Sequence, residues 1–351
     1  MLYIHIPFCD SKCNYCNFNS YTNLHHLQNR YIDALLHQLD FEIDRFQIEQ
    51  FQSIYIGGGT PSTLSIKNIE KLFSQLTRYI TPETEITIEA NPNSANRDWL
   101  SAIYQLGINR ISLGVQSFND RKLKFLGRNH SKNQAIRAVE NSHSVGFKNI
   151  NIDLIYNTSI DNLELIQTDI DTLFSLPISH TSLYSLTIEE GTPFANMKRV
   201  QREDIELTKY IIQRVDKKFP QYEISNFGTP SKHNLGYWQG KNYIGIGSGA
   251  VGFLKNRRFY PNRDVAKYIA NPLDIEIEKL TESDLKLEKL FLGFRSIVGV
   301  AKEILNHCEI EKADILVENG KLRFENGRYF NIDYLLADEV ALFVSDVIEC
   351  R

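Results

Sequence analysis

The opening residues decide the fold: an apolar run, Leu2-Tyr-Ile-His-Ile6, leads directly into Pro7-Phe-Cys9-Asp-Ser-Lys-Cys13-Asn-Tyr-Cys16. The three cysteines are spaced C-x3-C-x2-C, whereas Cys308 and Cys350 stand alone. Zinc sites usually take cysteines in pairs, and the chain has no second pair. A cubane 4Fe-4S cluster normally takes four thiolates, so three would leave one iron open to another ligand. The spacing favours an iron-sulfur loop over a disulfide framework, and Cys308 and Cys350 are expected to be inert thiols.

Outward from this loop, short β-rich runs alternate with amphipathic stretches. The predicted strands are Leu2–Ile6, Ser53–Ile56, Glu85–Glu89, Arg110–Val115, Asn149–Ile155 and Ser182–Leu186, with helices near 25–48, 65–79, 97–106, 132–145, 161–174 and 202–217. Successive β-then-α units imply parallel strands with right-handed crossovers, and the nearly continuous apolar runs predict burial on both faces. We therefore predict an α/β fold whose residues 1–220 form an incomplete (β/α)6 barrel.

Unusual residues stand where these strands end. Gly57-Gly58-Gly59-Thr60-Pro61 follows the second strand, and Glu89, Gln116 and Asp153 close the third, fourth and fifth. Barrels of this kind place their chemistry at the C-terminal strand ends. The glycines allow a ligand to approach the backbone closely, and Glu89 would meet a ribose hydroxyl or a cation. A tight turn and solvated strand ends are the alternative explanations.

These residues carry a family resemblance. Cys9-x3-Cys13-x-Tyr15-Cys16 resembles the cluster motif of the radical S-adenosylmethionine (SAM) superfamily, and Tyr3-Ile-His-Ile-Pro-Phe-Cys9 is similar to the oxygen-independent coproporphyrinogen III oxidase-like family within it. The resemblance implies a 4Fe-4S cluster on the three cysteines, SAM at the open iron, and a flavodoxin- or ferredoxin-like electron donor if SAM is cleaved to a radical. The SAM contacts that it implies are Tyr3, Tyr15, Gly58, Gly59, Thr60, Glu89, Gln116, Arg128 and Asp153, with Thr187 a weaker candidate.

A second motif, His233-Asn-Leu-Gly-Tyr237-Trp238, resembles the signature of the HemW-type haem chaperone branch of that family. A histidine can bind haem iron axially, and Tyr237 and Trp238 can stack on a porphyrin; a satisfied structural histidine is the alternative. The family's coproporphyrinogen dehydrogenases carry a fourth cysteine where this chain has Phe18. The resemblance therefore implies a chaperone that carries haem as cargo to acceptor proteins. Coproporphyrinogen III dehydrogenase, or another radical SAM enzyme of tetrapyrrole metabolism, is the alternative, and whether the protein is an enzyme stays open.

Beyond about residue 220 the β-then-α rhythm stops, and residues 221–351 are expected to form a smaller α+β, winged-helix-like domain that begins with Tyr222-Glu-Ile-Ser-Asn-Phe227 and contains the haem motif at 233–238. Helical patterns occur at 282–295, 300–307 and 337–348, and Val317–Arg328 is expected to form a hairpin across Glu325-Asn-Gly327. Gly247-Ser-Gly249-Ala-Val-Gly252 fits a dinucleotide fingerprint, but no clear helix follows it. We expect a close backbone turn near the mouth of the site instead.

Charge and hydropathy limit the classes of partner that the sequence predicts. Lys and Arg number 39 against 43 Asp and Glu, so the net charge of −4 argues against a nucleic-acid surface and favours a lid over a DNA-binding role for the C-terminal domain. No apolar run reaches the roughly 18 residues of a membrane span, and no signal peptide is evident. We expect a cytoplasmic protein without a membrane span that contacts haem acceptors, including membrane proteins transiently.

Overall fold

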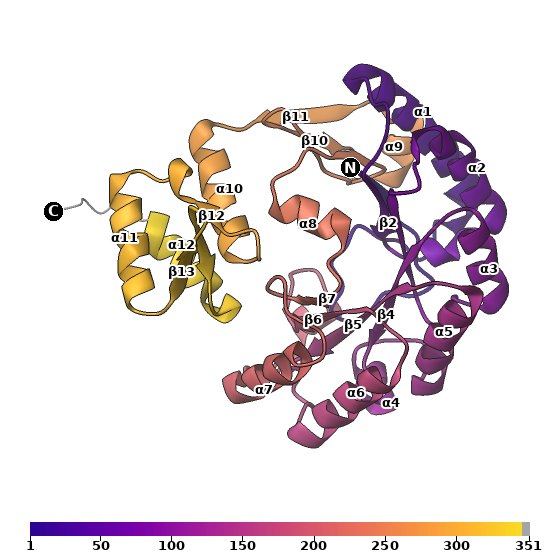
Figure 1. Ribbon diagram of the computed structural model, residues 1–351. Helices are drawn as coiled ribbons and strands as arrows, with labels where there is room; N and C mark the ends of the chain where they lie inside the picture. Colours follow the sequence, from indigo (N-terminus) through magenta and orange to yellow (C-terminus); the bar gives the residue numbers. More distant parts are fainter. Residues whose placement is uncertain (346–351) are drawn as a thin grey trace.

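A computed structural model of the chain describes residues 1–345 as an α/β barrel with a smaller unit beside it (Figure 1). The parallel strands of the barrel are β1 (Leu2–Ile6), β2 (Ser53–Gly58), β3 (Glu85–Ala90), β4 (Arg110–Gln116), β5 (Asn149–Tyr156) and β6 (His180–Ser185). The helices between and after them are α1 (Gln28–Phe46), α2 (Ile66–Leu76), α3 (Arg97–Gln105), α4 (Asp120–Phe125), α5 (Lys132–Val145), α6 (Leu163–Ser175) and α7 (Ile205–Asp216). The six predicted strands are confirmed, and the predicted helices are present with slightly different ends.

Most of these helices begin at a polar residue that the sequence makes available. The side chains that cap α2, α3, α4, α5, α6 and α7, each accepting a hydrogen bond from a backbone N–H in the first turn, belong to Ser65, Asn96, Asn119, Ser131, Asn162 and Asp204. Such caps satisfy N–H groups that have no partner within the helix. They fix where each helix starts after its strand.

The sheet does not close into a ring. Its strand order is β7-β6-β5-β4-β3-β2-β1-β8, in which β7 (Asn226–Gly228) pairs antiparallel with β6 and β8 (Ile244–Ile246) pairs parallel with β1. The incomplete (β/α)6 barrel is therefore confirmed. Both edge strands lie beyond residue 220, so the barrel sheet continues past the boundary that the change of rhythm predicts.

The two faces of the sheet differ in polarity. Along β4, Ile111, Leu113 and Val115 join the hydrophobic core beneath the helices, whereas the alternate residues Arg110 and Ser112 face the barrel interior with other polar side chains. Both faces are buried, as predicted, but only the outer one is apolar. The interior is a polar lining that leads from the N-terminal to the C-terminal ends of the strands.

The C-terminal part of the chain forms two smaller sheets. The first contains β9 (Gly252–Leu254), β10 (Arg257–Pro261) and β11 (Ile275–Lys279), with α9 (Val265–Ala270), and its residues share the barrel core. The second unit is α+β and contains α10 (Glu282–Phe294), β12 (Val300–Ala301), α11 (His307–Glu318), β13 (Leu322–Glu325), β14 (Arg328–Asn331) and α12 (Ala337–Ser345) around a core of its own. We therefore propose a domain boundary near residue 280 rather than 220.

Three C-terminal expectations need correction. The stretch 300–307 is a short strand followed by a 3-10 turn, because the next helix starts only where Asn306 caps it. The hairpin turns at Asn326-Gly327 as predicted, but its first strand starts at Leu322 because α11 occupies the residues before it. Residues 346–348 of the predicted last helix, and Cys350, lie outside the described part. Cys308 is disulfide-bonded, so it is not the inert thiol that its isolated position predicts.

The second unit lies beside the barrel. It joins through Ile224, whose N–H donates to Arg295 O at 2.9 Å, and through Ile297, whose N–H donates to Tyr222 O at 2.9 Å. In Figure 1 it stands apart from the strands, with α8 (Lys232–Trp238) between it and the barrel interior. Within residues 1–345, no helix has the length and apolar character that a bilayer crossing requires.

Candidate cluster and SAM site

The cysteine loop follows β1 and is tied down at both ends. The Cys9 N–H donates to Tyr21 O at 3.0 Å, and the Tyr21 N–H donates to Pro7 O at 2.8 Å. The middle of the loop is held by the Asn14 N–H, which donates to Leu126 O at 3.0 Å. Cys9 is buried, whereas Cys13 and Cys16 are half-buried and all three line one cavity. The loop therefore presents its thiols at the C-terminal end of the barrel.

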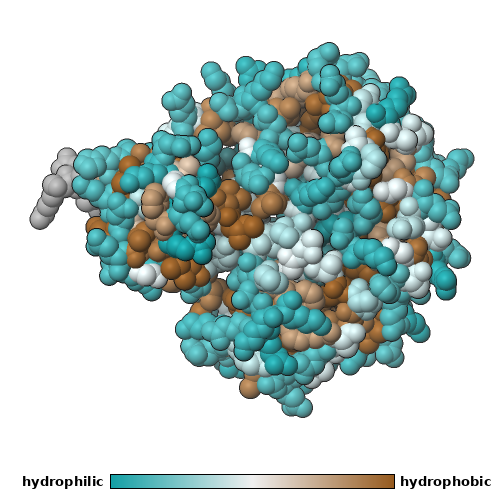
Figure 2. Space-filling view, in the orientation of Figure 1, coloured by the Kyte–Doolittle hydropathy of each residue, from teal (hydrophilic) through white to brown (hydrophobic). Residues whose placement is uncertain are grey.

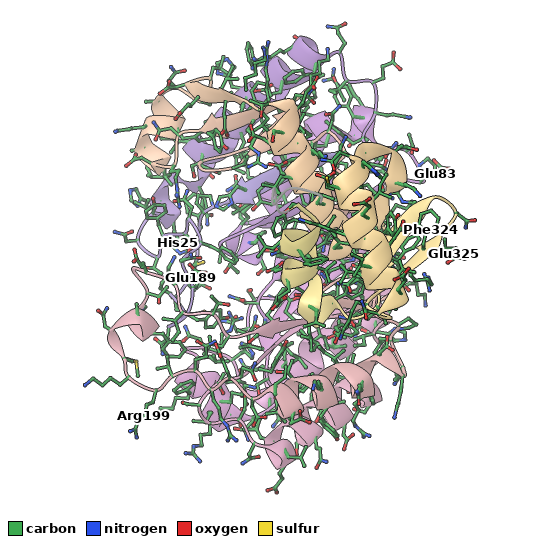
Figure 3. All side chains as sticks on the ribbon, turned by 90° about the vertical axis from the view of Figure 1, so that its left-hand side faces the viewer. His25, Glu83, Glu189, Arg199, Phe324 and Glu325 are labelled. Atoms are coloured by element: carbon green, nitrogen blue, oxygen red, sulfur yellow. The ribbon has the colours of Figure 1, made fainter. Side chains whose placement is uncertain are left out.

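This cavity has a volume of about 430 Å³, within the range of about 300–1,000 Å³ that is usual for small-molecule sites. The predicted residues that line it are Cys9, Cys13, Tyr15, Cys16, Gly58, Gly59, Thr60, Glu89, Gln116, Arg128, Asp153 and Thr187. Figure 3 places His25, whose ring hydrogen-bonds Cys9 O, and Glu189, which lines the cavity, on the side away from Phe324 of the second unit. The lining comes from residues 9–189, so the C-terminal unit does not line this cavity here, and its expected lid role stays a prediction.

Glu89 supplies a carboxylate at the end of β3. Its Oε1 accepts from the Tyr55 hydroxyl at 2.7 Å, and its Oε2 accepts from the Gly58 N–H at 3.2 Å. Burial raises the pKa of Glu89 to about 7, although the Tyr55 hydrogen bond acts in the opposite direction. The group is therefore poised between its neutral and anionic forms at neutral pH.

Asp153 gives the cavity a second carboxyl group, from the end of β5. Its Oδ1 accepts from Asn151 Nδ2 at 2.7 Å, and burial raises the pKa of Asp153 above its ordinary value. Together with Glu89 it offers a binding surface for cationic ligand groups, because bringing a cation close would stabilise the ionised carboxylates.

Arg128 adds a guanidinium to the lining of the cavity. Its Nη1 donates to Cys13 Sγ at 3.2 Å, and its Nη2 donates to Asn91 Oδ1 and to Gly114 O, both at 2.6 Å. Its Nε is buried and has no hydrogen-bond partner among residues 1–345. An unpartnered buried donor is costly, so this edge of the cavity is ready to receive an acceptor such as a carboxylate.

Backbone conformations adapt the strand ends to a ligand. Gly58 has a φ of +114°, and a Cβ there would lie 2.6 Å from the His5 ring. Gln116 has a φ of +70° where the β4–β5 register shifts, an uncommon conformation for a residue with a side chain. Such strain is typical of binding sites, where the surrounding structure holds it in place.

The donor set fits a cubane cluster better than a single ion. Among residues 1–345, no three His, Cys, Asp or Glu side chains are arranged to hold one metal ion. In a cubane, thiolates bind different irons, so they stand farther apart than ligands of one ion. Burial raises the pKa of the Cys9 and Cys16 thiols, so loading the cluster would release protons. When bound, a cluster with an open iron supplies a SAM binding position and an electron.

Comparisons with known proteins agree with this geometry. Residues 3–170 match the radical SAM superfamily. The chain is 37% identical, over 88% of its length and 86% of the relative's, to the haem chaperone HemW of Lactococcus lactis subsp. lactis strain IL1403. HemW of Bacillus subtilis strain 168 is 34% identical over 86% of this chain and 84% of its own. The chain belongs to the HemW haem chaperone family.

Membership of the radical SAM superfamily implies that this protein uses a 4Fe-4S cluster and SAM. Its fold is also that of coproporphyrinogen III oxidase (HemN) from Escherichia coli, described as a radical SAM enzyme. That structure matches with a TM-score of 0.83 and 18% identity, covering 99% of this chain and 90% of the other. The match extends the shared fold through the C-terminal unit.

One predicted SAM contact, Tyr3, is not part of the cavity lining. Its hydroxyl hydrogen-bonds His5 Nδ1 at 2.9 Å, and His5 Nε2 hydrogen-bonds Asn19 O at 2.8 Å. Tyr3 therefore supports the end of the cysteine loop from behind. The glycine-rich stretch helps there as well, because Asn19 Nδ2 donates to Ser248 O at 2.9 Å, which agrees with the expected turn near the site.

The histidine motif lies on α8, away from the cavity. His233 is fully buried, its Nδ1 is 2.9 Å from Ser53 Oγ, and its Nε2 is 2.9 Å from the Tyr237 hydroxyl. Burial lowers the pKa of His233 to about 3, so the imidazole is neutral. In this conformation neither ring nitrogen is free to bind iron. In the structure, His233 is therefore a structural histidine with both ring nitrogens hydrogen-bonded, which is the alternative given for the motif above.

Sequence reasoning missed residues that complete the cavity. Asn91 orients Arg128, while Ser112, Gly114 and Tyr184 line the wall. Period-two alternation was the available signal, because Ser112 and Gly114 share the inward face of β4 with the predicted Gln116.

Proposed function

We propose that this protein is a haem chaperone that binds a 4Fe-4S cluster and SAM, and carries haem to acceptor proteins. The observation that carries the proposal is the 37% identity to a haem chaperone over 88% of the chain. Cys9, Cys13 and Cys16 would hold the cluster. A cytoplasmic setting fits, because free clustered thiols and an oxygen-labile cluster need reducing conditions. Haem acceptors, including membrane proteins met transiently, and a flavodoxin- or ferredoxin-like electron donor would be the partners.

The charges of the cavity suit SAM, which carries a sulfonium, an ammonium and a carboxylate. Glu89 and Asp153 would face the cationic groups, and the unpartnered Nε of Arg128 would meet the carboxylate. Tyr15, Gly58, Gly59, Thr60, Gln116 and Thr187 complete the proposed contacts. Opposite charges at separate points of the lining would orient the ligand as well as bind it.

Phe18 supports carriage of haem over turnover of coproporphyrinogen. It lines the cavity and is 66% exposed, at the position where the resemblance implies a fourth cysteine in the dehydrogenases. A phenyl ring has neither the redox chemistry nor the metal affinity of a thiol. We therefore expect no coproporphyrinogen turnover.

For haem, the α8 motif offers the half-buried Trp238. It lines a cleft of about 190 Å³ between α8 and the second unit, next to one of about 440 Å³ that contains Leu235. Arg328 borders both clefts and Lys289 the smaller one. Figure 2 shows apolar surface between the second unit and the barrel. We propose that a porphyrin face packs on Trp238 while its propionates meet the two cations; His233 would ligate iron only if α8 opened.

An anaerobic experiment tests the proposal. Protein with a reconstituted cluster is titrated with haem, offered an apo-haemoprotein, and separately given SAM, a reductant and coproporphyrinogen III. We expect haem binding and transfer without decarboxylated product; catalytic formation of protoporphyrinogen would overturn the proposal. Trp238→Ala should weaken haem binding at least fivefold, because a buried aromatic contact contributes over about 1 kcal/mol. If His233→Ala alone abolishes the haem spectrum, α8 opens and His233 is the ligand.

A further inference from the structure

The molecule contains a direct connection between the SAM cavity and the helix that carries the histidine motif, through a residue that neither site uses. Tyr55 lies in the middle of β2 and faces the barrel interior. Its hydroxyl donates to Glu89 Oε1 at 2.7 Å, and its ring packs against His233 with centroids 5.2 Å apart. One rigid side chain therefore touches both a cavity carboxylate and the first turn of α8.

We propose that Tyr55 is a positioning residue that couples the SAM cavity to α8, orienting Glu89 through its hydroxyl and His233 through its ring. This inference rests on the proposed function, because it assumes that Glu89 contacts SAM. It adds a linkage: a ligand that prefers one position of Glu89 also prefers one position of α8. Linkage of this kind is reciprocal, so a change at α8 alters the affinity of the cavity for its ligand.

The helix end of the connection is held firmly. Ser53 and Tyr237 fix the two nitrogens of His233, and the Glu85 carboxylate accepts hydrogen bonds from the N–H groups of Lys232 and His233, both at 3.0 Å. A helix fixed in this way has few positions available to it. Movement transmitted through the Tyr55 ring would shift α8 as a unit, as expected for packed interiors, which deform between discrete arrangements.

The cavity end of the connection is sensitive to charge. The groups that face Glu89 are Tyr3 from β1, Tyr55 and the Gly58 N–H from β2, Arg110 from β4, Asp153 from β5 and Tyr184 from β6. Burial and Asp153 raise the pKa of Glu89, whereas Tyr55, Gly58 and Arg110 lower it, with the result near 7. The Tyr55 hydroxyl therefore stabilises the anion that a cationic ligand needs.

The first test compares pH profiles of SAM binding by anaerobic equilibrium dialysis, using full-length protein with its cluster loaded. Wild-type affinity should rise as the pH increases through about 7. Tyr55→Phe keeps the ring but loses the donor, so its midpoint should move up by about one pH unit, with binding about fivefold weaker at pH 7 and near wild type at pH 8.5. Tyr243→Phe, which removes a hydroxyl without a Glu89 contact, is the matched control. SAM itself titrates identically in all samples, so the difference reports the protein.

The second test measures hydrogen–deuterium exchange of residues 232–238 with and without saturating SAM at pH 8.5. SAM should slow exchange of α8 in wild type and in Tyr243→Phe, but not in Tyr55→Phe. An unshifted midpoint, or an α8 response that survives Tyr55→Phe, overturns the coupling while SAM binding by the wild type still supports the proposed function. Failure of the cluster-loaded wild type to bind SAM contradicts the proposed function, and the coupling with it.

Discussion

The Cys13 sulfur has two roles, as a cavity thiol and as a hydrogen-bond acceptor. Its sulfur is one of the three cavity thiols, and it also accepts a hydrogen bond from Arg128 Nη1 at 3.2 Å. A hydrogen bond from a guanidinium fixes the position of the sulfur. The same guanidinium is aimed at the cavity, so the position of Cys13 affects both the cluster and the proposed SAM carboxylate site.

The substitution Cys13→Ser should abolish cluster assembly, because two thiolates cannot hold a cubane that normally takes four. After anaerobic reconstitution, bound iron and absorption near about 400 nm should fall to background. Ser11→Ala, in the same loop and also lining the cavity, is the control and should keep its iron. Wild-type iron content in Cys13→Ser would show that the thiols are not cluster ligands.

Among the helices and strands, those that follow local patterns could be predicted. The run Leu2–Ile6 and the helix 132–145 occur with the predicted bounds, because an apolar run and a Ser131 cap define them within a few residues. The cavity could be predicted for a related reason. Its residues stand at strand ends, and parallel strands bring those ends together whatever the detailed packing.

The short helix α8 could not be predicted, and it decides how the histidine motif is read. Its burial depends on Glu85 and Ser53, which lie about 150 and 180 residues earlier in the sequence. No local pattern reports such a contact. The extension of the barrel sheet past residue 220 could not be predicted either. Its strands β7 and β8 are each three residues long and are defined by their pairing with β6 and β1, not by a local pattern.

The hydrogen bonds that attach α8 to Glu85 allow a prediction about the stability of this helix. The Glu85 carboxylate accepts from Ser231 Oγ at 2.9 Å and from the N–H groups of Lys232 and His233. Glu85→Gln keeps the shape but replaces one acceptor oxygen with a donor, so we expect a loss of about 2 kcal/mol in the free energy of unfolding. Hydrogen exchange within 232–238 should accelerate.

Glu83→Gln provides the control for that change. Glu83 stands two residues earlier and is exposed, and only its backbone oxygen contacts α8, through Lys232 Nζ at 2.7 Å. It should leave both the unfolding midpoint and the exchange rates unchanged. Equal exchange in Glu85→Gln and wild type would mean that packing on Tyr55, rather than the carboxylate, holds the helix.

Across the whole molecule, two hydrophobic cores meet at a junction that buries an acid. Glu223 is fully buried and lies between Tyr222 and Ile224, whose backbones pair with the second unit. Its Oε2 accepts from the Ser225 N–H at 3.1 Å, whereas Oε1 has no hydrogen-bond partner in the described residues. Burial raises the pKa of Glu223 from 4.5 to about 7. The junction is therefore most favourable when this carboxyl group is protonated.

The contribution of Glu223 to the stability of the whole protein should consequently depend on pH in a defined direction, opposite to that of buried histidines such as His233, whose pKa burial lowers. An acid with a higher pKa in the folded state binds its proton more tightly there, so the stability that Glu223 contributes is fully present below about pH 4.5 and is lost as the pH rises through about 7. For Glu223 the decline is at most about 3 kcal/mol, and Glu89 acts with the same sign. Glu223→Gln, neutral at every pH, lacks this contribution, so its free energy of unfolding relative to that of the wild type should rise between pH 5 and pH 8, whereas Glu89 and the buried histidines contribute equally in both proteins. Glu318→Gln, on the exposed face of α11, should retain the wild-type slope. If Glu223→Gln keeps the full wild-type difference between the two pH values, the acid is already solvated, and the junction must open in solution far enough to admit water.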